Sequence, residues 1–115
     1  MHIVKKRQMA KMSEDSSVRL VISAKGCGAE NCQAGFAVLK PGERLPQTGY
    51  SQHDSEEVSY VISGQIQVAT DSELDIAEEG DMVLQKRNAP HFNVNLSDKE
   101  AVLVWFITPQ TVAEQ

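Results

Sequence analysis

Apolar and polar residues alternate along most of this chain with a period of two. Runs rich in Val, Ile, Leu, Phe and Trp are separated by short polar stretches. Side chains of a β-strand point alternately to its two faces, so this pattern predicts half-buried strands. The predicted strands cover residues 18–22, 35–39, 58–62, 65–69, 74–77, 82–85, 92–95 and 101–107.

The stretches between these strands carry Gly, Pro, Asn, Asp or Ser, which favour turns. They lie at residues 40–43, 63–65, 78–81, 87–90 and 95–99. A helical period is absent from every segment of ten or more residues, and residues 8–16 are expected to form a helical turn at most. Many short strands without intervening helices indicate an all-β fold, namely an antiparallel β-barrel or jelly roll.

Length and composition favour a single domain that covers residues 1–115. A chain of 115 residues with 41% hydrophobic content can bury one core rather than two. Charged residues make up 23%, which is usual for a globular protein, so the chain is expected to fold. Residues 1–12 are interpreted as an N-terminal arm or strand, and residues 111–115 as a tail.

The formal charge of -5 argues against nucleic acid as the main partner, because phosphate binding requires a basic surface. Basic residues cluster only near the N-terminus, without aromatic residues between them, which indicates a solvated arm. No apolar run approaches the ~20 residues of a membrane span. No apolar stretch follows the N-terminal basic residues either, so a secretory signal is not expected and a cytoplasmic location is predicted.

The only cysteines, Cys27 and Cys32, lie in a glycine-rich stretch. A zinc site would require a second cysteine pair or nearby histidines in the sequence. A disulfide across this short turn is sterically possible but unexpected in a reducing compartment. We therefore interpret them as two free thiols.

Candidate chemistry concentrates in two histidine-bearing segments. Of three histidines in the chain, His53 and His91 lie there, one in each segment. An extended backbone would place His53 and Glu57 on one face, and an inward-facing carboxylate is costly unless a cation or hydrogen-bond donor meets it. His91 begins another predicted strand after a proline-containing turn. Two imidazoles and one carboxylate form the facial triad typical of Fe(II), and they also suit Mn, Ni or Zn.

These segments resemble the paired motifs of the cupin superfamily. The first cupin motif contains a histidine, one residue, a second histidine, three or four residues, a glutamate, six residues and a glycine. His53, Glu57 and Gly64 match its latter part. The 15 residues between Gly64 and Gly80 resemble the short connection of small single-domain bacterial cupins. The resemblance covers residues 34–108 and implies the double-stranded β-helix barrel of that superfamily.

The second cupin motif contains a glycine, five residues, a proline, one residue, a glycine, two residues, a histidine, three residues and an asparagine. Gly80, His91 and Asn95 match it. Lys86 and Asn88 stand where the motif has its proline and its second glycine. The resemblance implies a divalent metal ion (Zn, Mn, Fe or Ni) held by the matching histidines and glutamate.

One position departs from the family pattern, because Ser51 stands where cupins usually place their first metal histidine. A serine hydroxyl is a poor ligand beside imidazole. Two outcomes therefore stay open: the metal is lost, or Gln47, Gln52 or a water fills the fourth position. Asn95 is expected to be structural near the barrel mouth, and Trp105 is expected in the core.

Two hypotheses about function follow. The first is a metal-dependent enzyme that acts on a small oxygen-rich metabolite, such as a sugar, a uronate or a hydroxy or keto acid. Glu57 and His53 are its predicted catalytic residues, in isomerase, epimerase or lyase chemistry. The second is a non-catalytic ligand-binding or sensor protein with a degenerate metal site, which Ser51 favours. An Fe(II) dioxygenase that uses the same triad is a variant of the first.

A homodimer is the expected assembly. A domain of this size buries a limited fraction of its surface, and open sheet edges favour pairing. The segment His2–Val4 has strand character and precedes the core, so it is predicted to extend a partner's sheet. The family resemblance also implies dimers that form through N-terminal strands.

Overall fold

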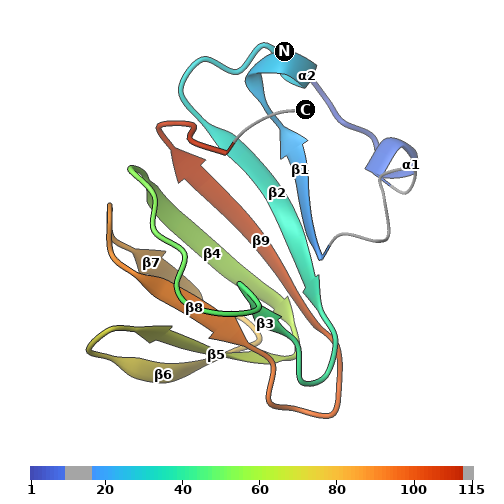
Figure 1. Ribbon diagram of the computed structural model, residues 1–115. Helices are drawn as coiled ribbons and strands as arrows, with labels where there is room; N and C mark the ends of the chain where they lie inside the picture. Colours follow the sequence, from blue (N-terminus) through green and yellow to red (C-terminus); the bar gives the residue numbers. More distant parts are fainter. Residues whose placement is uncertain (10–16, 113–115) are drawn as a thin grey trace.

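The computed structural model describes residues 1–9 and 17–112, and in these ranges the chain is mostly β (Figure 1). Two short helices precede or interrupt the strands. The elements are α1 (Lys6–Met9), β1 (Val18–Ile22), α2 (Ala24–Cys27), β2 (Gln33–Leu39), β3 (Arg44–Leu45), β4 (Glu56–Ser63), β5 (Gln65–Thr70), β6 (Leu74–Glu78), β7 (Met82–Gln85), β8 (His91–Val94) and β9 (Ala101–Thr108).

The strands form two sheets whose pairs are all antiparallel. One sheet has the order β1-β2-β9-β4-β7 and the other has the order β3-β8-β5-β6. The connection from β4 to β5 crosses between the sheets at Gly64, where a Cβ would lie 2.6 Å from the carbonyl oxygen of Glu100. This arrangement confirms the predicted all-β barrel or jelly roll.

The core lies between the two sheets. Alternate residues of β2 and β9 are buried along the whole length of each strand. The buried apolar cluster draws on both sheets and contains Ala37, Leu39, Val61, Ile66, Ala77, Ala101, Leu103, Trp105 and Ile107. The predicted core position of Trp105 is confirmed.

Gly35 permits the close approach of Trp105 to β2. A Cβ built at Gly35 would lie 1.9 Å from the carbonyl oxygen of Arg19 and 2.8 Å from Cζ2 of Trp105. Any larger residue would therefore displace either the β1 backbone or the indole. This glycine fixes the position of the single tryptophan of the chain.

All eight predicted strands are present, with ends that differ by at most two residues. Two features were not predicted: the two-residue β3, and α2, which Ser23 caps by accepting a hydrogen bond from the backbone NH of Gly26. Short polar segments of this kind lack the periodicity on which the prediction relied. The helical turn expected within residues 8–16 overlaps only the end of α1, and residues 10–16 lie outside the described ranges.

Cys27 and Cys32 are both free, as predicted. In the described residues, no helix is long and apolar enough to cross a membrane. The cytoplasmic location stays a prediction. The first nine residues contain no strand, so pairing of His2–Val4 with a partner's sheet also stays a prediction.

Candidate metal centre

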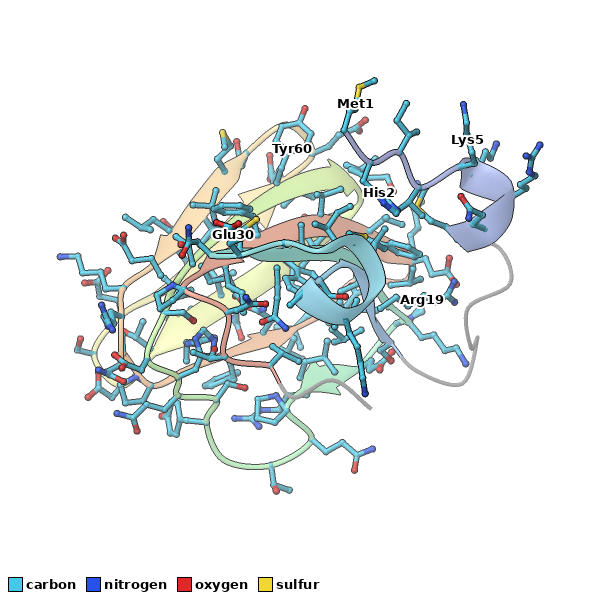
Figure 2. All side chains as sticks on the ribbon, turned by 90° about the horizontal axis from the view of Figure 1, so that it is seen from above. Met1, His2, Lys5, Arg19, Glu30 and Tyr60 are labelled. Atoms are coloured by element: carbon cyan, nitrogen blue, oxygen red, sulfur yellow. The ribbon has the colours of Figure 1, made fainter. Side chains whose placement is uncertain are left out.

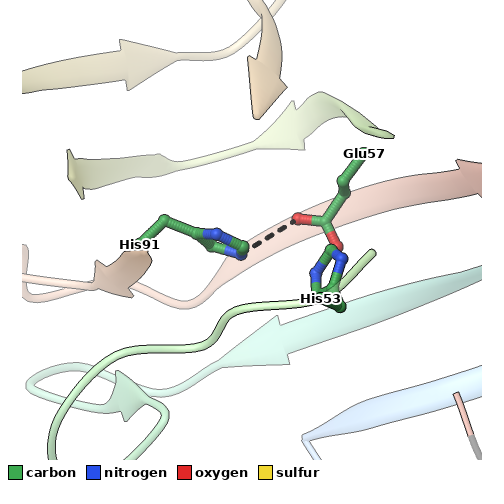
Figure 3. A group of neighbouring side chains, drawn as sticks. All are labelled: His53, Glu57 and His91. Carbon is green, nitrogen blue, oxygen red and sulfur yellow. Dashed lines mark ion pairs between the residues drawn. The ribbon is translucent and has the colours of Figure 1, made fainter. Parts of the chain in front are cut away.

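The three predicted ligands come from separate parts of the chain and meet at one end of the barrel interior (Figure 3). His53 lies in the loop before β4, Glu57 is the second residue of β4, and His91 is the first residue of β8. The Nε2 atom of His53 lies 3.8 Å from Oε1 of Glu57, and Nε2 of His91 lies 3.8 Å from Oε2. One ligand atom from each residue falls within 4.8 Å of the other two.

Hydrogen bonds at Nδ1 hold both imidazoles so that Nε2 faces the carboxylate. Nδ1 of His91 lies 2.9 Å from the carbonyl oxygen of Ala89, which can only accept, so this nitrogen carries the proton. Nδ1 of His53 lies 2.7 Å from Oγ of Ser55. A donor fixed at Nδ1, as in His91, leaves the lone pair of Nε2 free for a metal ion, which is the usual arrangement around metal-binding histidines.

Burial differs among the three side chains. His91 is 6% exposed, Glu57 17% and His53 23%. The site is therefore open to solvent on the side of His53 and closed on the side of His91. A carboxylate this far removed from water requires a positive partner, and the two Nε2 atoms at 3.8 Å are too distant to be good hydrogen bonds. A divalent cation between these atoms fits that requirement.

The convergence of His53 and Glu57 has a different basis from the expected one. The sequence argument placed both on a single extended stretch, but β4 begins only at Glu56 and the backbone bends at residues 54–55. His53 reaches the site because its loop folds back over the barrel. The bend also places Ser55, which is fully buried, beneath the imidazole.

A clasp of polar contacts joins the loop that carries His53 to the turn that precedes His91. The backbone NH of Asn88 donates to the carbonyl oxygen of His53 at 2.8 Å. Nε2 of Gln52 donates to the carbonyl oxygen of Asn88 at 2.7 Å, and the guanidinium of Arg87 pairs with the carboxylate of Asp54. These contacts fix the separation of the two histidine-bearing loops.

The two charged residues of this clasp, Arg87 and Asp54, are exposed to solvent. The hydrogen bond from Arg87 lowers the pKa of the Asp54 carboxyl below its ordinary value, and the side-chain hydrogen bond from Asn88 acts in the same direction. Asn88 adopts a φ of 62°. Asparagine tolerates this left-handed conformation better than most residues, which explains how it replaces the glycine of the cupin motif.

Ser51 supports His91 through its backbone. The two residues form a bridge, with N–O distances of 2.8 Å and 2.9 Å. Of the predicted substitutes for the missing histidine, Gln52 uses its side-chain amide on Asn88, and Gln47 is exposed. Neither of these glutamines lines the cavity beside the triad, whereas Ser51 does.

A cavity of about 200 Å³ adjoins the three ligands. Its walls are mostly apolar, with polar groups near the triad. The lining residues are Val18, Ala37, Leu45, Ser51, His53, Glu57, Ser59, His91, Asn93, Leu103, Trp105 and Val112. Neither Ser59 nor Asn93 was predicted as a site residue, although strand alternation places each on the same face as the predicted ligand two residues before it.

Asn95 has the structural role expected for it. Its side chain is fully buried, and Nδ2 donates to the carbonyl oxygens of Leu39 at 3.0 Å and Lys99 at 2.7 Å. Its Oδ1 accepts from the backbone NH of Ser97 at 3.0 Å. Asn95 thus ties together the turns at the end of the barrel away from the ligands.

Comparison with known protein families matches residues 35–107 to the cupin domain. The match covers both histidine-bearing segments and well over half of the chain. The chain belongs to the cupin family. Metal binding is common in this family, and in this chain His53, Glu57 and His91 lie close enough together to hold a metal ion.

Solved structures support the fold. The TT1209 protein of Thermus thermophilus superposes with a TM-score of 0.72 at 20% identity, covering 96% of this chain and all of that one. A Cupin 2 conserved barrel domain protein of Salinispora arenicola gives 0.72 at 16% identity, over 93% and 88% of the two chains. The BH2720 protein of Bacillus halodurans gives 0.76 at 13% identity, over 97% and 83%. No curated protein matches the sequence.

Proposed function

We propose that this cupin binds one divalent metal ion through His53, Glu57 and His91 and acts on a small oxygen-rich metabolite in the adjoining cavity. The observation that carries the proposal is the orientation of the ligand atoms. Both imidazoles present Nε2 to one partly buried carboxylate, and each is held by a hydrogen bond at Nδ1. Zn, Mn, Fe and Ni all accept this set of donors.

A divalent ion at this site would supply Lewis acidity toward a carbonyl or hydroxyl oxygen. Isomerases, epimerases and many lyases share one step, which is removal of a proton from the carbon next to a carbonyl group. His53 and Glu57 are the residues proposed to move that proton, because they line the solvent-facing side of the cavity. The buried His91 is given the role of a ligand only.

A binding protein without catalytic activity is the second candidate. Ser51 favours it, because the chain offers three ligands among its described residues and no fourth side chain in the position where cupins usually have one. In that case the cavity would hold a small polar metabolite without converting it. The first candidate requires the metal ion, whereas the second has a degenerate metal site and converts no substrate.

Metal analysis tests the proposal. The chain would be purified without a histidine tag, incubated with Zn, Mn, Fe(II) or Ni, desalted and analysed by mass spectrometry. We expect about one metal ion per chain for the wild type, and none for His91→Ala or Glu57→Gln. His2→Ala is the matched control, because His2 is exposed and outside the site, and it should retain the metal. Equal metal content in the wild type and His91→Ala would overturn the proposal.

We also propose that the protein is a homodimer that uses the outer face of the five-stranded sheet. Six neighbouring side chains on that face are apolar and 40–69% exposed. They are Tyr60 and Ile62 of β4, Met82 and Leu84 of β7, and Val104 and Phe106 of β9. Strand register makes the patch continuous, since Tyr60 pairs with both Val104 and Met82.

The size of this outer apolar face suits a second copy of the chain. A large side chain exposes roughly 200 Å² when free, so the six expose about 600 Å², at the upper end for a monomer. A standard interface buries about 800 Å² per partner, of which about 60% is apolar. Figure 2 shows Tyr60 on the same side of the molecule as Met1 and His2, so an N-terminal arm would lie beside such a partner.

A further inference from the structure

The cavity continues from the triad into the barrel along two strands. Ser59 follows Glu57 on β4 and Asn93 follows His91 on β8, and both line the cavity. A smaller void beneath it shares Glu57, Ser59, Asn93 and Leu103 as lining residues. The space that a ligand would occupy is therefore bounded by the metal ligands at one end and by the barrel interior at the other.

The charge in this space is confined to the triad. Among the described residues that line either the cavity or the void, none is Lys or Arg, and Glu57 is the only carboxylate. The far wall consists of Leu45, Leu103 and the indole of Trp105, with Ser59 and Asn93 as neutral polar groups. A divalent ion on the triad would leave a net charge of about +1 there, because one carboxylate offsets half of it.

Two neutral polar groups in this wall lack partners. Nε1 of Trp105 and Oδ1 of Asn93 are both buried, and neither makes a hydrogen bond with the described residues. An indole NH can only donate and an amide oxygen can only accept. Leaving either group unpaired costs roughly 1–3 kcal/mol. Such a cost is expected where a ligand, rather than the protein, supplies the partner.

We infer that the ligand carries at most one negative group, which lies at the triad, and that the rest of it is uncharged and partly apolar. This inference rests on the proposed function and narrows its substrate class. A second anionic group would enter a wall without cations, and an unpaired buried charge is far more costly than an unpaired polar group. Dicarboxylates and phosphorylated acids, which carry two anionic groups, are therefore excluded. Short hydroxy or keto monoacids and neutral hydroxycarbonyl compounds remain.

The cavity volume agrees with a ligand of that size. At about 200 Å³ it lies below the 300–1,000 Å³ typical of pockets for drug-sized ligands. Oxygen groups on the ligand would pair with Trp105 and Asn93, while its carbon chain would contact Leu45 and Leu103. Discrimination between ligands thus depends on the charge at the end of the ligand that lies far from the metal, rather than on the group that approaches the metal.

Two probes with the same head group test the inference. α-Ketovalerate and α-ketoglutarate have the same five-carbon chain and the same keto acid head, but the first ends in a methyl group and the second in a carboxylate. Binding to the Zn²⁺-loaded protein would be followed by calorimetry and by the fluorescence of Trp105, the only tryptophan. Titration of free Zn²⁺ with each acid corrects for chelation in solution. We expect α-ketovalerate to bind at least tenfold more tightly.

A variant with a cation in the wall checks that charge is the cause. Leu45→Arg should raise the affinity for α-ketoglutarate at least tenfold, whereas the matched neutral variant Leu45→Met should not. Far-UV circular dichroism and zinc content would verify that both variants fold and bind metal. If Leu45→Arg does not fold, the affinities of the wild-type protein for the two acids still test the inference.

The outcomes separate this inference from the proposed function. A protein that takes up no metal contradicts the proposed function itself. A metal-loaded protein that binds α-ketoglutarate as tightly as α-ketovalerate, or binds neither acid, leaves the metal site standing and overturns the inference. The inference is supported if the wild-type protein binds α-ketovalerate more tightly than α-ketoglutarate and if Leu45→Arg reduces or reverses this difference in affinity.

Discussion

The two faces of the five-stranded sheet depart from the usual distribution of residues in opposite ways. The outer face exposes aromatic and aliphatic side chains such as Tyr60 and Phe106. The inner face supplies most of the apolar core, and at one end it also carries Glu57 and Ser59 from the same strand, β4. Alternating strand geometry produces both faces at once, because successive residues point in opposite directions.

The two faces therefore depart in different ways from the rule that apolar side chains are buried and polar side chains are exposed. Polar groups on the inner face cost stability unless something pairs with them, and the proposed metal ion and ligand would supply those partners. Apolar groups on the outer face lose the benefit of burial unless another surface covers them. Stability experiments can test each face independently, since substitutions on one face leave the other in place.

The largest loss of stability is expected for Gly35→Ala, on the inner face of the sheet. The added Cβ would meet the backbone of Arg19 and the indole of Trp105, and neither can move without disturbing β1 or the core. We expect a loss of about 3 kcal/mol or more in the free energy of unfolding, measured by denaturant titration. The control is Gly26→Ala, whose nearest contact is Oγ of Ser23 at 3.2 Å. Equal stability of the two variants would contradict the close packing of Trp105.

Metal binding should give the next largest effect. A ligand present at a hundred times its dissociation constant stabilises the native state by about 2.7 kcal/mol, so metal should raise the melting temperature and a chelator should reverse the rise. His91→Ala should remove this response. A wild-type melting temperature that is the same with metal and with chelator would favour a metal-free binding protein.

Substitution on the outer face should change assembly and leave folding intact. Phe106→Lys places a charge within the outer apolar face and should weaken the dimer by about 2 kcal/mol, or roughly thirtyfold in dissociation constant. Analytical ultracentrifugation would measure the shift toward the 12.7 kDa monomer. The control is Leu74→Lys, which changes an exposed leucine of β6 in the other sheet.

Deletion of residues 1–12 separates the two ways of forming a dimer. Loss of the dimer would support strand exchange through His2–Val4. Retention of the dimer, together with its loss in Phe106→Lys, would support the sheet face. A wild-type protein that is monomeric at micromolar concentration would contradict both.

Asn93→Leu is expected to have a smaller effect, and it should increase the stability of the fold. This substitution removes a buried amide oxygen that has no hydrogen-bond partner among the described residues and retains a similar volume. The metal-free protein should gain about 1 kcal/mol in unfolding free energy, measured by chemical denaturation. A loss of stability would indicate that the Asn93 amide already has a hydrogen-bond partner within the folded chain, so that no ligand is needed to supply one.

The smallest effect concerns the exposed clasp between the two loops. Because Arg87 lowers the pKa of Asp54, the pair stabilises the fold above the ordinary aspartate pKa, and this contribution disappears as the pH falls through the lowered value. Arg87→Gln should raise the Asp54 pKa toward its ordinary value, as followed by NMR titration. Lys86→Gln is the control, and an Asp54 pKa that is the same in both variants would contradict the pairing.

The sequence by itself determined the longer strands and identified the three residues that meet at the candidate metal centre. Period-two alternation depends only on neighbouring residues, so it predicted all eight of the longer strands, and β7 matched at both ends. The spacing of His53, Glu57 and His91 in paired motifs identified the group that the fold brings together. The free thiols and the structural role of Asn95 were also predictable from local chemistry.

Only the tertiary structure decided how these parts meet. The loop of His53 is fixed by contacts with Asn88 and Arg87, which are more than thirty residues away, and no local pattern encodes such pairs. The neutral wall beyond the triad likewise arises where β3, β4, β8 and β9 converge. Strand periodicity is set by the backbone, whereas a cavity depends on which side chains from distant strands face one another and on what they leave unpaired.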